Sequence, residues 1–482
     1  MQRPRRKRAG RNDVFLGIDV GTTVLKVCAV DSAAGNVLAH VSRRLPLKQS
    51  ADGGREQNVR GLDNALGGAV KSVRQSLGDR WDTVAGIGLA AQGGSSIMAD
   101  RKTGKALTPM VLWNDARAND CAAIVEKRTT PEFWREFTLR EGVPHGLARM
   151  VWLRERASAL FHDFNIHAGA GEWIFHRLTG IWRQDPGNAI QVGSYNAATK
   201  RLDAAAFDVV DLPLSLVATL RDGHETAPLS KAAAKRFRLP AGLPVAGPYI
   251  DQEAGYLSAV GVSQRPVHCS LGTAWVCNYT RPETLHIDSP RQLVLKSVLN
   301  GGQLVVLPLK TGNAAWDSIL HRCVDPNHEK ALEKAAAIFE KRLTPSDGAV
   351  AAAATLDVSG IPSDPSPERR GDFIRATVVR MVFELAEALD TPITKKYADA
   401  LVLGGGASKG SYFRRMIAAL FPDLPVRRQT GEALAAARGS LYAFSPRIAC
   451  APTAAVRRPG EADCNALRQM RIQYQEARSI DQ

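Results

Sequence analysis

The chain has 482 residues, more than a single hydrophobic core usually serves, and this length predicts two domains. With 45% hydrophobic and 23% charged residues, its composition is that of a globular protein, which excludes the disordered and fibrous classes. The formal net charge of +15 would suit a nucleic-acid binder, but six basic residues lie within the first eleven positions, so this charge says little about the folded part.

The first twelve residues are expected to form a solvated basic tail. The segment MQRPRRKRAGR lacks the apolar core of a secretory signal and any apolar periodicity. Nucleic-acid binding would rest on this tail alone, without an aromatic platform or a recognised motif, so nucleic acid is not an expected partner. No apolar run approaches the roughly 20 residues of a membrane span, so no membrane partner is expected either.

The seven cysteines and ten histidines bear on compartment and metal binding. No CxxC pair and no HExxH spacing occurs, so neither disulfides nor a zinc site is predicted. Unpaired thiols favour a reducing compartment, and the predicted location is the cytoplasm.

The first part of the chain predicts strands that alternate with helices. Residues 14–48 predict two or three strands joined by the turn DSAAGN. A helix is expected over LDNALGGAVKSVRQSL, residues 62–77, followed by an apolar strand over VAGIGLAAQ, residues 84–92. This alternation indicates an α/β domain.

The opening pattern recurs about half a chain later. FLGIDVGTTVLKV at 15–27 and VHCSLGTAWVCNY at 267–279 both consist of an apolar strand, a Gly-Thr turn and a second apolar strand. The recurrence suggests two similar halves, each opening with a hairpin, and places a boundary near residues 255–262.

The second half predicts further elements of the same kind. A helix is expected over 373–389, and a strand, a triple glycine and a helix over 396–421, whereas the Pro- and Ser-rich stretch 343–370 predicts a loop. A terminal helix over 461–480 would place Leu467, Met470 or Arg471, and Tyr474 on one face.

The first hairpin turn carries residue types that suit phosphate and metal. A glycine lets backbone N–H groups approach a phosphate closely, and the hydroxyls of Thr22, Thr23 and, in the second hairpin, Thr273 could add donors. Lys26 supplies a positive charge, and Asp19, at a strand end, could hold hydrated Mg²⁺. An ordinary hairpin turn remains the alternative explanation for these residues.

Two other segments could bear chemistry. The glycines of ALVLGGG, residues 400–406, lie between a strand and a helix, where backbone can lie against a nucleotide. Asp251, in LPVAGPYIDQEAG, could be a helix N-cap or a general base. Neither GxxxxGK[ST] nor GxGxxG in a βαβ context is present, which disfavours P-loop and Rossmann enzymes.

Together these segments resemble the FGGY family of carbohydrate kinases, in order from about residue 14 to 445. The matching motifs are DVGTTVLK, AAQGGSSIMAD, VLWNDAR, LTGIWRQDPGNA, AGPYIDQEAG, SLGTAWV, LVLGGGASKGSYFRRMIAAL and EALAAARGSLYAF. The resemblance implies an α/β fold of two ribonuclease H-like (actin-like ATPase) domains with ATP and sugar in a central cleft. The domains would be 13–257 and 258–446, preceded by the tail at 1–12 and followed by an extension at 447–482.

The resemblance also implies roles for single residues. Asp251 would be the catalytic base that takes the proton of the attacking sugar hydroxyl, and Asp19 would hold Mg²⁺. The ATP phosphates and adenosine would contact Thr22, Thr23, Lys26, Thr273, Gly312, Gly405 and Gly406. The sugar would contact Gln92, Gly93, Gly94, Trp113, Asp251 and Gln252.

The substrate is less well indicated than the reaction. VLWNDAR is similar to the motif of the xylulose kinase branch and favours a ketopentose such as xylulose. At the positions of Gly93 and Gly94, however, the xylulose kinase branch has Met-His and the glycerol kinase branch has Arg-Glu. The lost side chains would enlarge the pocket. A polyol such as glycerol or erythritol, or another ketose, remains an alternative substrate. A homodimer remains a possible oligomeric state. Retention of Asp19 and Asp251 disfavours a non-catalytic nucleotide-binding sensor.

Overall fold

The computed structural model of the chain describes residues 13–272, 274–289, 291–297, 299, 301–309, 312–345, 367–431 and 434–480. The predicted basic tail, Thr273 and most of the predicted loop at 343–370 lie outside these residues.

The chain divides into two compact units, each built from separate stretches. Unit 1 holds the described residues of Met1–Gly261, Thr280–Val306 and Leu434–Ala451, and unit 2 those of Val262–Tyr279, Leu307–Ala433 and Pro452–Gln482. The two domains predicted from the sequence, 13–257 and 258–446, are contiguous stretches and therefore differ from the compact units. The domain boundaries stay a prediction.

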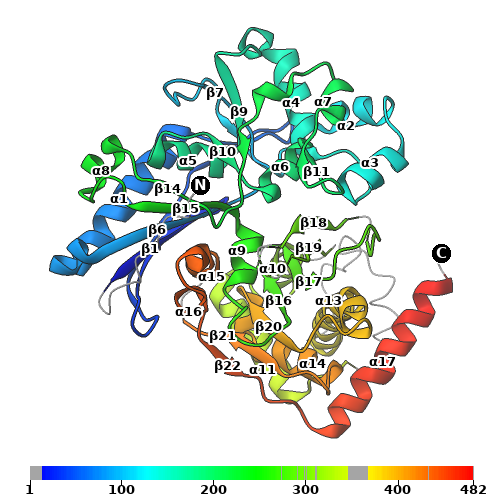
Figure 1. Cartoon of the computed structure of the whole chain (residues 1–482). Coiled ribbons are helices and arrows are strands. Elements are labelled where there is room, and N and C mark those ends of the chain that lie inside the picture. Colours follow the sequence, from blue (N-terminus) through cyan, green and yellow to red (C-terminus); the bar gives the residue numbers. More distant parts are fainter. Residues whose placement is uncertain are drawn as a thin grey trace. The chain divides into compact units, whose positions relative to one another are not determined.

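The main sheet of unit 1 has six strands in the order β14-β15-β6-β1-β2-β3 (Figure 1). Strand β1 pairs antiparallel with β2 and parallel with β6, and β15 is parallel to β6. The strands are β1 (Val14–Val20), β2 (Val24–Asp31), β3 (Val37–Arg44), β6 (Val84–Ala91), β14 (Thr226–Pro228) and β15 (Pro244–Ile250).

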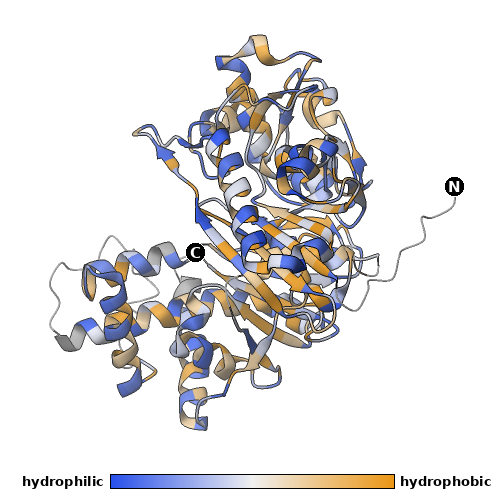
Figure 2. Cartoon of the chain, turned by 90° about the vertical axis from the view of Figure 1, so that its left-hand side faces the viewer, coloured by the Kyte–Doolittle hydropathy of each residue, from blue (hydrophilic) through white to orange (hydrophobic). Residues whose placement is uncertain are grey.

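The burial of these strands follows from their composition and place in the sheet. All seven residues of β1 are buried, as its nearly continuous apolar run predicts for a central strand, whereas β3, at the sheet edge, ends in exposed polar residues. Figure 2 shows hydrophobic colours along the strands and mixed colours on the helices. The predicted hairpin and strand at 14–44 and the predicted strand at 84–92 are thus confirmed.

Helix α1 (Val59–Leu77) packs against β2 and β3 with an apolar face. Its buried residues include Leu62, Leu66 and Val73, at the three- and four-residue spacing of one helix face. Asn58 caps the helix because its side chain accepts a hydrogen bond from the Gly61 amide.

Unit 1 holds further short elements around the sheet. Its other helices are α2 (Asn119–Glu126), α3 (Pro131–Thr138), α4 (His145–Arg156), α5 (Ala170–Thr179), α6 (Pro186–Val192), α7 (Ala205–Asp208), α8 (Lys231–Phe237), α9 (Asp251–Leu257), α15 (Ala435–Gly439) and α16 (Pro446–Ala449). Its small strands are β4 (Leu47–Gln49), β5 (Arg55–Gln57), β7 (Ile97–Asp100), β8 (Met110–Val111), β9 (Asn165–Ala168), β10 (Arg183–Gln184), β11 (Tyr195–Asn196), β12 (Arg201–Leu202) and β13 (Thr219–Leu220).

Unit 2 repeats the strand pattern of unit 1. Strand β16 (Pro266–Leu271) pairs antiparallel with β17 (Trp275–Arg281) and parallel with β20 (Ala400–Gly404). The parallel strand β21 (Val426–Gln429) and the edge strand β22 (Thr453–Ala455) follow. The order β17-β16-β20-β21 matches β2-β1-β6-β15, which confirms the half-chain repeat predicted from the two Gly-Thr turns. Strand β18 (Leu293–Lys296) pairs antiparallel with β19 (Gln303–Pro308), and by residue number β18 and the first four residues of β19 belong to the unit 1 stretch Thr280–Val306.

The helices of unit 2 include those predicted near the triple glycine and at the C-terminus. They are α10 (Asn313–Cys323), α11 (His328–Lys341), α13 (Pro367–Thr394), α14 (Ser411–Leu420) and α17 (Glu461–Ile480). Leu467, Met470 and Tyr474 of α17 are buried, and the Tyr474 ring lies 5.5 Å from the Phe383 ring of α13. The predicted terminal helix and its apolar face are confirmed.

Two properties bear on the predicted location. Among the described residues, no helix is both long and apolar enough to cross a membrane. All seven cysteines are free thiols, as their spacing predicted. The cytoplasmic location stays a prediction.

Candidate functional site

The first hairpin turn places a carboxylate and an ammonium group on neighbouring strands. Asp19, near the end of β1, is directly opposite Lys26 of β2, and the Lys26 Nζ lies 3.2 Å from the Asp19 Oδ2. Asp19 is only 5% exposed, so its charge is partly shielded from water by the sheet. The turn itself is closed by a hydrogen bond from the Gly21 amide to the Val24 carbonyl.

The Thr22 hydroxyl in this turn connects three parts of unit 1. It donates to the Gln92 Oε1 at 3.0 Å and accepts from the Trp113 Nε1 at 3.0 Å. Gln57 Nε2 donates to the Thr22 carbonyl, and Gln92 Nε2 donates to the Gln57 Oε1 at 3.3 Å. Because β6 runs parallel to β1, its end lies beside the turn, and the Gln92 amide donates to the Val20 carbonyl. The predicted residues Thr22, Gln92 and Trp113 are therefore brought together.

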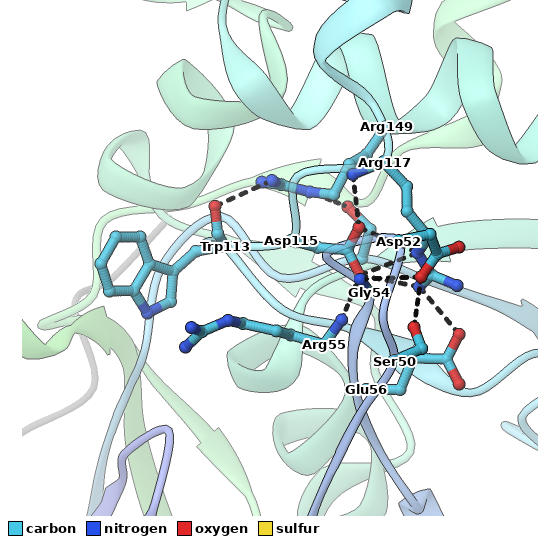
Figure 3. A network of polar contacts seen from close by, with 10 residues as sticks. Ser50, Asp52, Gly54, Arg55, Glu56, Trp113, Asp115, Arg117 and Arg149 are labelled. Atoms are coloured by element: carbon cyan, nitrogen blue, oxygen red, sulfur yellow. Dashed lines mark hydrogen bonds and ion pairs between the residues drawn. The ribbon is translucent and has the colours of Figure 1, made fainter.

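The loop after Trp113 is fixed by two arginines (Figure 3). The buried Arg149 of α4 donates to the Trp113 carbonyl at 3.0 Å and to the Gly94 carbonyl. Arg117 donates to the Asp115 carboxylate through both Nε and Nη2 and also bonds Glu56. Burial of Asp115 would raise its pKa, but the hydrogen bonds from Arg117 and the Arg55 amide outweigh this effect and hold the pKa below its usual value.

These contacts separate the roles of the VLWNDAR residues. The Trp113 side chain is 44% exposed, and Figure 3 shows its ring pointing away from the carboxylate network. Trp113 is therefore not a core residue, and its ring is available to a ligand. Arg117 is engaged by two carboxylates and lies 4.5 Å from the centre of the Trp152 ring, so it shapes the loop.

Asp251 follows the last residue of β15 and is the first residue of α9. Ile250 is paired with Ala91 of β6, so Asp251 emerges at the same sheet edge as Gln92. Its Oδ1 accepts a hydrogen bond from the adjacent Gln252 amide at 2.8 Å. The N-cap position of α9 belongs to Ile250, so the alternative that Asp251 is an N-cap is not observed.

The electrostatics of Asp251 suit a proton acceptor. Burial, and then the negative charge of Asp19, raise the pKa of Asp251 to about 7, although the Gln252 amide and Lys26 act in the opposite direction. A carboxylate with a pKa near neutrality can accept a proton and still be largely ionised slightly above pH 7.

Asp19 and Asp251 also define what the site offers to a metal ion. No group of three or more His, Cys, Asp or Glu side chains in the described part of the chain is placed to hold a metal. A hydrated Mg²⁺ needs fewer, because it keeps several waters and binds through one or two carboxylates together with substrate phosphates. The Asp19 carboxylate, close enough to Asp251 for their charges to interact, fits this requirement.

The space beside Gly93 and Gly94 is filled by another residue. A Cβ atom built on Gly93 would overlap the Nε2 of Gln191, and one built on Gly94 would lie 2.6 Å from the Gln191 Oε1. The hypothesis that the two glycines enlarge the pocket is therefore wrong, because the Gln191 side chain from α6 lies where their side chains would be. Gly94 also has a φ of +72°, a backbone conformation that favours glycine.

In unit 2, the end of β20 lies against the second hairpin turn. Gly405 has a φ of +82°, and a Cβ atom there would lie 2.5 Å from the carbonyl carbon of Leu271 and 2.8 Å from the Gly272 amide nitrogen. The Asn313 side chain donates to the Leu271 carbonyl at 3.3 Å, and its Nδ2 would be 3.2 Å from a Cβ on Gly406.

The predicted nucleotide residues thus fall into two groups. Gly405, Gly406 and Gly312, the residue before Asn313, lie around the second turn, although the extended backbone of Gly312 does not require glycine. Thr22, Thr23 and Lys26 lie at the first turn, in the other unit.

Sequence reasoning missed three side chains that organise the site. Gln57 connects the Thr22 carbonyl with Gln92, Arg149 holds the backbone of Gly94 and Trp113, and Gln191 fills the space beside Gly93. None belongs to a motif. Only the short LTGIWRQDPGNA segment, whose Asp185 caps α6, pointed toward the neighbourhood of Gln191.

Comparison with known proteins adds the family context. Residues 14–258 match the family model described as the N-terminal domain of the FGGY family of carbohydrate kinases. A probable glycerol kinase from Caenorhabditis elegans is 25% identical over 225 residues, which are 43% of this chain and 43% of that protein. A xylulose kinase from Staphylococcus epidermidis is 23% identical over 266 residues, which are 55% of this chain and 52% of that protein. The chain therefore spans about half the length of the curated relatives it matches.

The crystal structure of xylulose kinase from Rhodospirillum rubrum is similar over nearly the whole chain. It aligns with a TM-score of 0.84 over 97% of this chain and 98% of that chain, at 18% sequence identity. This likeness confirms the predicted fold of two ribonuclease H-like (actin-like ATPase) domains.

Proposed function

Because the chain belongs to the FGGY family of carbohydrate kinases, we propose that it transfers the γ-phosphate of ATP to a hydroxyl of a sugar or polyol. The observation that carries this proposal is the position of Asp251. Asp251 directly follows β15, which is the strand beside β6, and Gln92 directly follows β6. The Asp251 carboxylate has a pKa near 7 and interacts with the charge of Asp19.

The proposed role of Asp251 is that of general base. Its carboxylate would accept the proton of the attacking hydroxyl, which makes the oxygen a better nucleophile toward the γ-phosphorus. The burial that raises the pKa of Asp251 supports this role, because a more basic carboxylate accepts the proton more readily.

The proposed phosphate contacts come from the first turn in unit 1 and from glycines in unit 2. Thr22, Thr23 and Lys26 would donate to phosphate oxygens, while Gly405 and Gly406 would lie against the nucleotide. Mg²⁺, when bound at Asp19, would supply charge neutralisation for the phosphates. Thr273 keeps its proposed phosphate role, although it lies outside the described residues.

The proposed sugar contacts are on unit 1. Trp113 offers an exposed ring, and Gln92, Gln252 and the backbone of Gly93 and Gly94 lie at or next to the strand ends that carry Asp251. A ketopentose such as xylulose is the first candidate substrate, because VLWNDAR is similar to the xylulose kinase branch and a xylulose kinase is among the curated relatives. The similarity to a probable glycerol kinase favours a polyol as the second candidate.

The test is ADP release by the purified full-length protein with Mg-ATP against ketopentoses, ketohexoses, polyols and glycerol. Turnover on one of these compounds, lost in Asp251→Asn, would support both the reaction and the base. A wild-type protein that binds ATP but phosphorylates none of them would refute the proposed function.

A further inference from the structure

The Gln191 side chain takes the place of two absent side chains at the edge of the unit 1 sheet. Gly93 and Gly94 directly follow Gln92. The atom nearest to an added Cβ is the Gln191 Nε2 at Gly93 and the Gln191 Oε1 at Gly94. At Gly93 the next neighbour is the Ile250 Cγ2, at 3.2 Å, so this space also adjoins the residue before Asp251.

The backbone of Gln191 is held firmly. Helix α6 begins at the capping carboxylate of Asp185, which accepts from the Asn188 amide at 2.9 Å, and ends at Gly193 in the left-handed conformation. Gly146 of α4 packs so closely that an added Cβ would lie 2.5 Å from the Gln191 carbonyl oxygen. The helix therefore cannot shift toward α4, so the Gln191 backbone keeps its place, while the amide at the end of the side chain can still rotate.

The Gln191 amide has unused hydrogen-bonding capacity. Its only side-chain hydrogen bond in the described structure is from Nε2 to the Gly187 carbonyl at 3.5 Å, the long limit for such a contact. An amide offers two donor hydrogens and an acceptor oxygen, and Gln191 is partly exposed. A neutral group that can both donate and accept is matched to a hydroxyl, which also does both.

We propose that Gln191 hydrogen-bonds a hydroxyl of the substrate and determines which sugar or polyol is accepted. This inference rests on the proposed function, because it assigns a specificity-determining residue to that same site. Gln191 would supply, from α6, the polar contact that Gly93 and Gly94 cannot provide.

The experiment compares Gln191→Leu, which keeps the approximate shape but removes the amide, with the wild type. A matched control is Gln75→Leu, at an exposed position of α1. Both variants and the wild type are assayed with the preferred substrate and with its single-deoxy analogues. Sugar binding is measured separately by isothermal titration calorimetry. The KM for ATP is measured in parallel.

Gln191→Leu is expected to lower kcat/KM for the preferred substrate by about 10- to 100-fold, mainly through KM. It should cause no further loss on the one deoxy analogue that lacks the recognised hydroxyl, because enzyme and substrate have then lost the same bond. The KM for ATP and the behaviour of Gln75→Leu should be unchanged.

Gly93→Ala provides a second test that does not alter Gln191 itself. The added methyl group would displace the Gln191 amide, so this variant should show the same pattern on the deoxy analogues. Equal relative kcat/KM values across the whole panel for wild type and Gln191→Leu would overturn the inference while leaving the kinase proposal intact. If the wild type phosphorylates no sugar but binds one, equal affinity of wild type and Gln191→Leu for that sugar would also overturn the inference about Gln191. A wild type that neither binds nor phosphorylates any sugar or polyol would refute both proposals.

Discussion

Replacing Gly405 by alanine tests the close approach of β20 to the second hairpin turn. The positive φ of +82° costs alanine about 1 kcal/mol. The added Cβ would also lie 2.5 Å from the Leu271 carbonyl carbon and 2.8 Å from the Gly272 amide nitrogen. Since backbone atoms cannot rotate away, this overpacking adds about 2 kcal/mol. We expect Gly405→Ala to lower the free energy of unfolding of unit 2 by about 3 kcal/mol in total.

Gly431 provides a matched control within unit 2. Its φ is +89°, but among the described residues other than its chain neighbours no atom lies within 4 Å of an added Cβ. Gly431→Ala should therefore lower the free energy of unfolding by only about 1 kcal/mol, through backbone strain. The difference of about 2 kcal/mol corresponds to melting temperatures that differ by about 4–8 °C in a unit of this size. Differential scanning calorimetry measures it, and the KM for ATP should rise for Gly405→Ala alone. Equal melting temperatures for the two variants would refute the reasoning.

Three further predictions concern unit 1. Thr22→Val removes the hydrogen bonds to buried Gln92 and from Trp113, so denaturant titrations should show a free energy of unfolding lower by about 1–3 kcal/mol. An equal loss of stability in Thr22→Ser, which keeps the hydroxyl, would contradict this role. The kcat/KM for sugar should rise with pH through about 7 and then level off, because Asp251 must be ionised to accept a proton and its pKa is raised to about 7. A flat profile between pH 5.5 and 8.5 would argue against Asp251 as the base. Arg117→Lys keeps the charge but loses the paired hydrogen bonds to its carboxylate partner, so the melting temperature should fall while the KM for ATP stays unchanged.

The sequence predicted best those features that depend on neighbouring residues in the chain. The two hairpins, helix α1 and the buried face of α17 follow from local apolar patterns and turn residues, and all are found. The pairing of Gln92 with Thr22 is different, because it depends on the register between β6 and β1, which no local pattern contains.

The expectations that failed concern the environment of single side chains. The enlarged pocket was inferred from the absence of side chains at Gly93 and Gly94, and the position of Gln191 almost 100 residues later could not be read from that segment. The hydrogen bonds from Arg149 to the carbonyl groups of Trp113 and Gly94 could not be read from the sequence either. Such contacts are set by packing between distant elements, and the sequence carries no periodic signal for them.

The repeated hairpin gives a physical reason for the distribution of predicted roles. In each unit, a central parallel strand, β6 or β20, ends beside the turn of an antiparallel hairpin. In unit 1 that end carries Gln92, whose side chain bonds the turn, and in unit 2 it carries Gly405, whose lack of a side chain permits close backbone contact. The same topology thus provides a polar site in one unit and a backbone-lined site in the other.

The most direct measurement is detection of the phosphorylated sugar or polyol by ³¹P NMR after incubation with Mg-ATP, for wild type, Asp251→Asn and the exposed control Asp79→Asn. We predict a phosphate ester from the wild type and from Asp79→Asn, and at least a hundredfold slower formation with Asp251→Asn, because the base contributes about 10²- to 10⁴-fold to the rate. Formation of the ester by Asp251→Asn at the wild-type rate would contradict the assignment of Asp251 as the base at the centre of this site.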